Sequence, residues 1–168
     1  CPIDGDKIKS CIGCKTCAIM NGFGGAGAFS DGKYNITNEF GGTLYEYIGK
    51  QKAIELMEYV DGINVSYGGY KTKLYSTANT QFKRLCLQNN LHLLDASVRH
   101  LGTDINFEVL ENLYNELKEK IEFHFMTPVR SIKILDGGYE AVTDNASFTG
   151  ERCIISVGRS GSKWMEKV

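Results

Sequence analysis

The chain is organised around the stretch Gly22–Asn38, which reads Gly-Phe-Gly-Gly-Ala-Gly-Ala-Phe-Ser-Asp-Gly-Lys-Tyr-Asn-Ile-Thr-Asn. Five glycines fall within its first eleven residues, and small hydrogen-bonding side chains follow them. Glycine permits positive φ and close approach of the backbone to another group. Backbone amides without side chains suit phosphate oxygens or a flat polar ring. The composition therefore predicts a loop wrapped around a ligand, with a flexible surface loop as the plain alternative.

Gly22, Gly24 and Gly27 also fit the GxGxxG pattern. The dinucleotide-binding fingerprint needs a strand before this pattern, a helix after it and an acidic residue about twenty positions on. Here cysteines precede the glycines, and no amphipathic helix follows them. The context therefore argues against a dinucleotide fingerprint at this position.

Length and charge limit the classes of protein to which the chain can belong. With 168 residues, of which 42% are hydrophobic, it has the length of one domain with a real core. A net charge of −1 gives no indication of nucleic acid or of an anionic membrane as partner, and no apolar run is long enough to span a bilayer. We expect a cytoplasmic protein. Because the chain opens on Cys1-Pro2 and stops at a helix just begun, we expect an internal piece of a larger protein.

Four cysteines near the start, Cys1, Cys11, Cys14 and Cys17, are spaced C-x9-C-x2-C-x2-C. Cysteines two residues apart can direct two thiolates at one metal, and four thiolates complete a zinc or iron–sulfur site. Pro2 after the remote cysteine favours a cluster, whereas zinc fits the same ligands. Reduced thiols or a redox dithiol pair remain the alternative to a metal.

The middle of the chain predicts mixed helices and strands. The sequence predicts a helix over 40–59 that begins at a Thr43–Glu46 capping box and is broken at Gly49, then a strand over 63–67. Thr80 is expected to cap a helix reaching Asn90, with a strand over 91–98 after it. Gly102 makes a turn, and Thr103 or Asp104 is expected to cap the next helix.

The last third predicts one amphipathic helix and several short strands. The helix carries its apolar positions from Phe107 to Leu117 and is followed by an alternating strand over 121–125. Strands over 129–132 and 139–143 flank a hairpin turn at Asp136-Gly137-Gly138, and a strand over 147–149 follows them. The apolar run 152–158 predicts a buried, parallel strand with a ligand crevice at its carboxyl end.

The glycine-rich stretch carries a resemblance to bacterial FAD-dependent dehydrogenases. Gly25-Ala26-Gly27 followed by Gly32-Lys33-Tyr34-Asn35-Ile36-Thr37-Asn38 is similar to a loop that lies against the flavin in that family. The full run 22–35 is similar to the uncharacterised FAD-dependent dehydrogenase group, and His100-Leu101-Gly102-Thr103-Asp104 also occurs in similar proteins. Relative to the wider pattern, Lys33 replaces arginine, Tyr34 replaces cysteine and Val157 replaces threonine.

The resemblance implies a fold and an organisation. The expected fold is α/β with α+β character: an incomplete Rossmann-like FAD/NAD(P)-binding domain with an antiparallel β-meander and an inserted region of helices and strands. Residues 1–38 would form the Cys-rich segment and the flavin-contacting loop, 39–104 the substrate-side insertion, and 105–168 the truncated helix and meander. The missing dinucleotide-binding portion of the parent chain would be a partner, and the fragment alone would neither retain FAD nor be active.

The resemblance also implies a function, that of a FAD-dependent oxidoreductase passing hydride or electrons between a small-molecule substrate or electron donor and the flavin. His100 and Lys33 are candidate catalytic residues, and Arg99 would lie with His100 at the substrate face. The implied cofactor-binding residues are Gly24, Gly25, Ala26, Gly27, Ser30, Asp31, Gly32, Lys33, Asn35, Val129 and Gly158. A cluster held by the four cysteines would relay single electrons to or from the flavin.

Two other functions remain open. The piece could be a Cys-rich metal-binding or interaction module without catalysis of its own. Alternatively, the flavoprotein could modify tRNA or thiols with the cysteines as redox partners, although nothing in the charge pattern favours nucleic acid.

Overall fold

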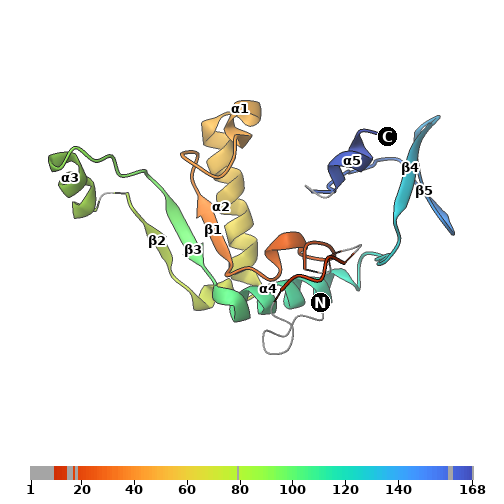
Figure 1. Cartoon of the computed structure of the whole chain (residues 1–168), viewed down its shortest axis with the longest axis horizontal. Coiled ribbons are helices and arrows are strands. Elements are labelled where there is room, and N and C mark those ends of the chain that lie inside the picture. Colours follow the sequence, from red (N-terminus) through yellow and green to blue (C-terminus); the bar gives the residue numbers. More distant parts are fainter. Residues whose placement is uncertain (1–9, 15–16, 18, 79, 159–160, 168) are drawn as a thin grey trace. The chain divides into compact units, whose positions relative to one another are not determined.

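The computed structural model describes residues 10–14, 17, 19–78, 80–158 and 161–167. By its internal contacts the chain forms two compact units, Cys1–Lys120 and Ile121–Val168. Helices and antiparallel sheets alternate along the described residues (Figure 1). This confirms the mixed α and β character that the sequence predicts, and each unit is described below by itself.

The first unit contains a three-stranded antiparallel sheet of order β1-β3-β2. Its strands are β1 (Lys33–Ile36), β2 (Leu74–Ser76) and β3 (Ser97–His100). Lys33 pairs with His100, and Tyr34 pairs with Arg99. Because side chains alternate along a strand, Tyr34, Ile36 and Arg99 share one face and are half-buried or buried. Lys33 and His100 share the other face and are exposed.

Among the described residues of this unit, four α-helices and two 3₁₀ turns accompany the sheet. The helices are α1 (Leu44–Ile48), α2 (Lys50–Ser66), α3 (Gln81–Gln88) and α4 (Gly102–Leu117), and the turns are η1 (Gly25–Gly27) and η2 (Gly69–Lys71). Gly49 separates α1 from α2 with φ 84° and ψ 151°, which confirms the predicted break. The buried hydrophobic residues are Ile36 of β1, Ala53 of α2, Val109 of α4 and Leu101, which precedes α4.

Several predicted boundaries in this unit are wrong. Residues 63–66 belong to α2, whose buried residues at this end, Asp61 and Asn64, are three positions apart and so share one side of the helix. The strand predicted over 91–98 begins only at Ser97. The Thr43 hydroxyl caps nothing, since the Glu46 amide donates to the Thr43 carbonyl instead. Helix α4 begins at Gly102, so neither Thr103 nor Asp104 is its cap.

The second unit contains the predicted β-meander. Strands β4 (Val129–Leu135), β5 (Gly138–Thr143) and β6 (Ser147–Gly150) pair in sequence order, all antiparallel. Asp136-Gly137 forms the two-residue turn between β4 and β5, with Gly137 at φ 88°. The short helix α5 (Ser162–Met165) follows. The meander and its hairpin turn are confirmed.

Two other strands predicted for this unit are absent from the described residues. Neither 121–125 nor 152–158 has strand structure, and Ile154 is 92% exposed. The run 152–158 was expected to be buried and parallel. A buried strand needs a neighbouring strand to pair its backbone groups. Within the described part of the chain, no strand pairs with this run.

Candidate functional site

The glycine-rich segment is a chain of tight turns that ends in a strand. The amides of Gly25, Ala28 and Ser30 donate to the carbonyls three residues earlier, at 3.0, 3.2 and 3.2 Å. The prediction of a ligand-wrapping loop as far as Asn38 is wrong from Lys33 onward, because residues 33–36 form β1. Before β1, the exposed residues of the segment are Gly22, Gly24, Ala26, Gly27, Phe29 and Asp31.

Asn106 of α4 holds this segment in place. Its Nδ2 donates to the carbonyls of Gly27 (2.9 Å) and Ala28 (3.3 Å), and its Oδ1 accepts from the Tyr34 hydroxyl (3.0 Å). Asn106 is fully buried. A fully buried carboxamide with all these bonds fixes the position of the turn relative to β1 and α4. The Phe23 ring, which packs edge-on against Tyr114 with centroids 5.4 Å apart, adds an apolar contact to the same helix.

Sequence reasoning missed Asn106. The available signal was a polar residue placed three and four positions before Val109 and Leu110, on the apolar side of a helix. A buried asparagine at such a position must find hydrogen-bond partners. Its partners lie more than seventy residues away in sequence, so the pattern alone could not identify them.

The glycines of the segment fall into two groups. A Cβ at Gly24 would lie 2.9 Å from Leu110 Cδ1, and a Cβ at Gly32 would lie 2.9 Å from Asn106 Cβ. Both also have positive φ, at 81° and 62°. Packing against α4 therefore explains why glycine stands at these two positions.

Gly27 differs from them. A Cβ there would meet nothing within 4 Å among the described residues, and its φ is not positive. Neither packing nor backbone conformation within the described chain requires a glycine here. Gly25 also faces open space, but its φ of 56° favours glycine by itself. At Gly27, therefore, the choice of glycine is best explained by an external group that approaches the backbone.

Asp31, Lys33 and His100 form a cluster of ionisable side chains beside the turns. Lys33 Nζ lies 2.7 Å from Asp31 Oδ2, and His100 Nε2 lies 3.7 Å from the same oxygen. The hydrogen bond from Lys33 lowers the pKa of the Asp31 carboxyl below its usual value. All three side chains are about half exposed. The structure thus brings together the two candidate catalytic residues, which are far apart in sequence.

Two further predicted ligand-contacting residues have different surroundings. The Ser30 hydroxyl donates to the Gly27 carbonyl (2.8 Å) and accepts from the Gly32 amide (3.2 Å), so its proton is used inside the turn. Asn35 is exposed and lies directly opposite Val98 of β3. Alternation along β1 places Asn35 on the same face as Lys33.

Arg99 does not belong to the exposed cluster, contrary to the prediction that it would lie with His100. Its Nε and Nη2 donate to the two Asp61 carboxylate oxygens at 2.6 and 2.8 Å, and its Nη1 donates to the Thr72 carbonyl at 2.9 Å. Arg99 and Asp61 are both 8% exposed. Neighbouring residues in a strand point to opposite faces, so Arg99 is a structural cation on the buried side.

Val129 and Gly158 belong to the second unit. Val129 begins β4 and pairs with Thr143, and Gly158 lies in a turn with φ 62° whose carbonyl accepts from the Gly161 amide. The expectation that these residues share a crevice with Gly25 stays a prediction.

The predicted metal ligands are only partly described. Cys1 lies outside the described residues, whereas Cys11 and Cys14 are exposed and Cys17 is half-buried. Within the described part of the chain, no group of three or more potential ligand side chains is close enough to hold a metal. A cluster or zinc site therefore stays a prediction.

No known protein family, no curated protein and no solved structure matches this chain. Among the described helices, none is long and apolar enough to cross a bilayer. The site's own groups are the Lys33 ammonium, the His100 imidazole and the Asp31 carboxylate, beside an exposed glycine-rich segment.

Proposed function

We propose that the chain is part of a FAD-dependent oxidoreductase related to bacterial FAD-dependent dehydrogenases. One observation carries the proposal. The two segments in which the sequence resembles that family, 25–38 and 100–104, are neighbours: the amides of Leu101 and Gly102 donate to the carbonyls of Gly32 and Asp31 at 3.0 and 2.9 Å. A chance resemblance in two separate segments would not require them to meet.

The site's composition fits a flavin. Open space around Gly27 leaves the peptide backbone accessible to a flat ring, and Lys33, six residues further along the chain, would supply a positive charge to that ring. When bound, FAD supplies the acceptor and donor for hydride or electrons. This chain would orient the ring through the turns, stabilise negative charge with Lys33 and hold a proton on His100. Asp31 would keep the Lys33 ammonium in place.

The proposal also extends to the fold of the second unit, the cellular compartment and the cysteine segment. The β4–β6 meander would belong to a Rossmann-like FAD-binding domain, with Val129 and Gly158 on its cofactor side and the dinucleotide-binding portion as its partner. The free cysteines Cys11, Cys14 and Cys17 fit a reducing, cytoplasmic compartment. An iron–sulfur cluster or zinc on the cysteine segment would be the second group.

Replacing Gly27 with alanine tests the flavin contact. We expect Gly27→Ala to leave the free energy of unfolding unchanged or to raise it by up to about 1 kcal/mol, because the added methyl meets no atom and the unfolded chain loses freedom. In the protein expressed at the full length of its gene, the same methyl should weaken FAD binding about tenfold or more. Equilibrium unfolding and FAD titration measure the two effects.

Gly24→Ala is the matched control. It should destabilise the protein by about 1–3 kcal/mol through its positive φ and the contact with Leu110. If Gly27→Ala leaves FAD affinity intact while the protein binds FAD, then the flavin does not lie on this turn.

The effect of the Lys33 charge is tested by measuring the midpoint reduction potential of the bound flavin. Lys33→Gln should lower the midpoint potential of the bound flavin by about 30 mV or more, because the reduced, anionic flavin loses a nearby positive charge. Lys73→Gln, at an exposed position outside the cluster, is the control. Equal potentials for the two variants would remove Lys33 from the flavin site.

The alternative function is a Cys-rich metal-binding module, for which Cys11 and Cys14 are free and exposed. It predicts metal bound by the protein and no loss of FAD affinity when residues 24–30 are altered. An iron–sulfur cluster would be coloured, whereas zinc would be colourless.

A further inference from the structure

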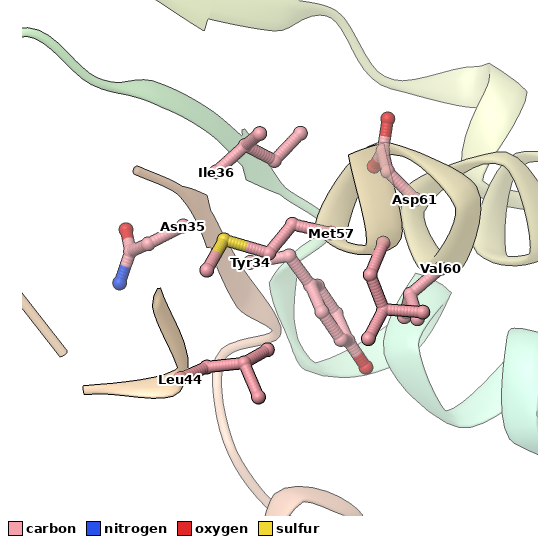
Figure 2. Close-up of a pocket in the computed structure, with 8 residues that line it drawn as sticks. Tyr34, Asn35, Ile36, Leu44, Met57, Val60 and Asp61 are labelled. Atoms are coloured by element: carbon pink, nitrogen blue, oxygen red, sulfur yellow. The ribbon is translucent and has the colours of Figure 1, made fainter. Parts of the chain in front are cut away.

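A pocket of about 220 Å³ lies between β1, α1 and α2 in the first unit. Its walls are Tyr34, Asn35 and Ile36 of β1, Leu44 of α1, and Leu56, Met57, Val60 and Asp61 of α2. Figure 2 shows Met57 and the Tyr34 ring near its centre, with Ile36 and Leu44 on opposite sides. The pocket lies on the side of β1 toward which Tyr34 and Ile36 point, opposite Lys33 and His100.

Two of the three polar side chains in the pocket wall, Tyr34 and Asp61, are already hydrogen-bonded. The Tyr34 hydroxyl donates to Asn106 Oδ1, which leaves the aromatic ring as its contribution to the wall. Both Asp61 oxygens accept from Arg99. The carboxamide of Asn35 lies at the edge of the pocket, turned away from Met57 (Figure 2). A ligand in the pocket therefore meets no unpaired charge.

The pocket is open and apolar. Leu44, Leu56 and Val60 expose 37%, 44% and 42% of their surface, so their apolar carbons face water at its rim. A dry apolar cavity of about 150 Å³ is large enough to bind benzene, so 220 Å³ admits one or two fused rings. The Met57 thioether and the Tyr34 ring are favourable neighbours for an aromatic ring.

We propose that this pocket binds a small, uncharged aromatic molecule of one or two rings. Ring burial would cover the exposed rim of Leu44, Leu56 and Val60 and would contact the Met57 sulfur. A carboxylate or ammonium group on the ligand would be excluded, because the only charged residue in the wall, Asp61, is paired with Arg99. The site is independent of the proposed flavin site and does not require FAD.

Indole is the probe, and the four methionines of the chain provide the readout. In protein labelled with ¹³C at the methionine methyl groups, titration with indole should produce a saturable shift of the Met57 signal. The expected dissociation constant is on the order of 1 mM or tighter for a probe of this size. Met126, which is 93% exposed, should not shift, and Met57→Leu identifies the signal.

Two variants on the same helix make the test specific. Val60→Trp fills the pocket from its rim and should weaken indole binding about tenfold or more. Tyr59→Trp introduces the same side chain at an exposed position outside the pocket wall and should leave the binding unchanged. Benzoate should give no saturable shift of Met57.

Three results would overturn the proposal. Equal shifts of Met57 and Met126 would show non-specific contact, and equal indole binding by Val60→Trp and Tyr59→Trp would place the probe elsewhere. A Met57 signal that moves with protein concentration alone, with a matching change in sedimentation, would show that a second copy of the chain covers the groove instead. None of these results depends on whether the protein binds FAD.

Discussion

Arg99→Leu is expected to destabilise the first unit by about 3–5 kcal/mol, because it leaves the Asp61 carboxylate buried without its partner. The pair is bidentate, and both residues are 8% exposed, so little water can replace the guanidinium. The Thr72 carbonyl loses its donor as well. Urea denaturation followed by far-UV circular dichroism, with amide hydrogen exchange in α2 to assign the loss to this unit, measures the effect.

Two comparisons separate the buried charge from the loss of a hydrogen-bonded arginine. The double variant Arg99→Leu with Asp61→Leu removes both charges and should recover most of the lost stability. Arg130→Leu removes the arginine of a second bidentate pair, with Asp144, whose side chains are 60% and 53% exposed. That change should have a much smaller effect. If Arg99→Leu costs no more than Arg130→Leu, the pair with Asp61 is not buried in solution.

Asn106→Leu is expected to cost about 2–4 kcal/mol and to release the glycine-rich turns. The substitution removes the donor for two carbonyls and the acceptor for the Tyr34 hydroxyl, and an unsatisfied buried polar group costs about 1–3 kcal/mol. Amide hydrogen exchange should accelerate more in residues 25–32 than in α4. The same variant should weaken FAD binding by the full-length protein, since the turns would no longer be held against β1.

Asn115→Leu is the matched control on the same helix. Asn115 is exposed. Among the hydrogen bonds of the described residues, its side-chain Oδ1 accepts only from Lys118 Nζ. The substitution should change the free energy of unfolding by less than about 0.5 kcal/mol. Equal exchange rates in the turns of Asn106→Leu and Asn115→Leu would mean that Asn106 does not anchor them.

Glycine-based turn and break signals predicted the local structure correctly at two positions. The Asp136-Gly137 turn and the break at Gly49 depend on glycine conformations that neighbouring residues cannot alter, and both are confirmed. The meander follows because its strands are joined by short turns, so their pairing is decided within a few residues.

Features that depend on contacts distant in the sequence could not be predicted from the sequence pattern. Residues 63–66 alternate as a strand would, but they continue α2, whose preceding turns already fix the helix. The apolar run 152–158 is exposed because a strand forms only where another strand pairs with it. Asn106 and Asp61 bond to partners that are far away in the sequence. Such pairings produce no periodic pattern of residues from which they could be predicted.

The candidate site was predicted in its parts and not in its assembly. The sequence singled out Lys33, His100 and the glycines separately, and the antiparallel register of β1 with β3 brings Lys33 opposite His100. Arg99 was predicted to accompany His100, but alternation along β3 directs it to the opposite face. One residue of register thus decides whether Arg99 or His100 faces the site.

The absorption spectrum of the protein at the full length of its gene, purified without air and then supplied with FAD, tests the central proposal most directly. We predict the two visible bands of protein-bound flavin, retained after gel filtration and weakened in the Gly27→Ala variant. A folded full-length protein that shows no flavin band either before or after the addition of FAD would contradict the proposal.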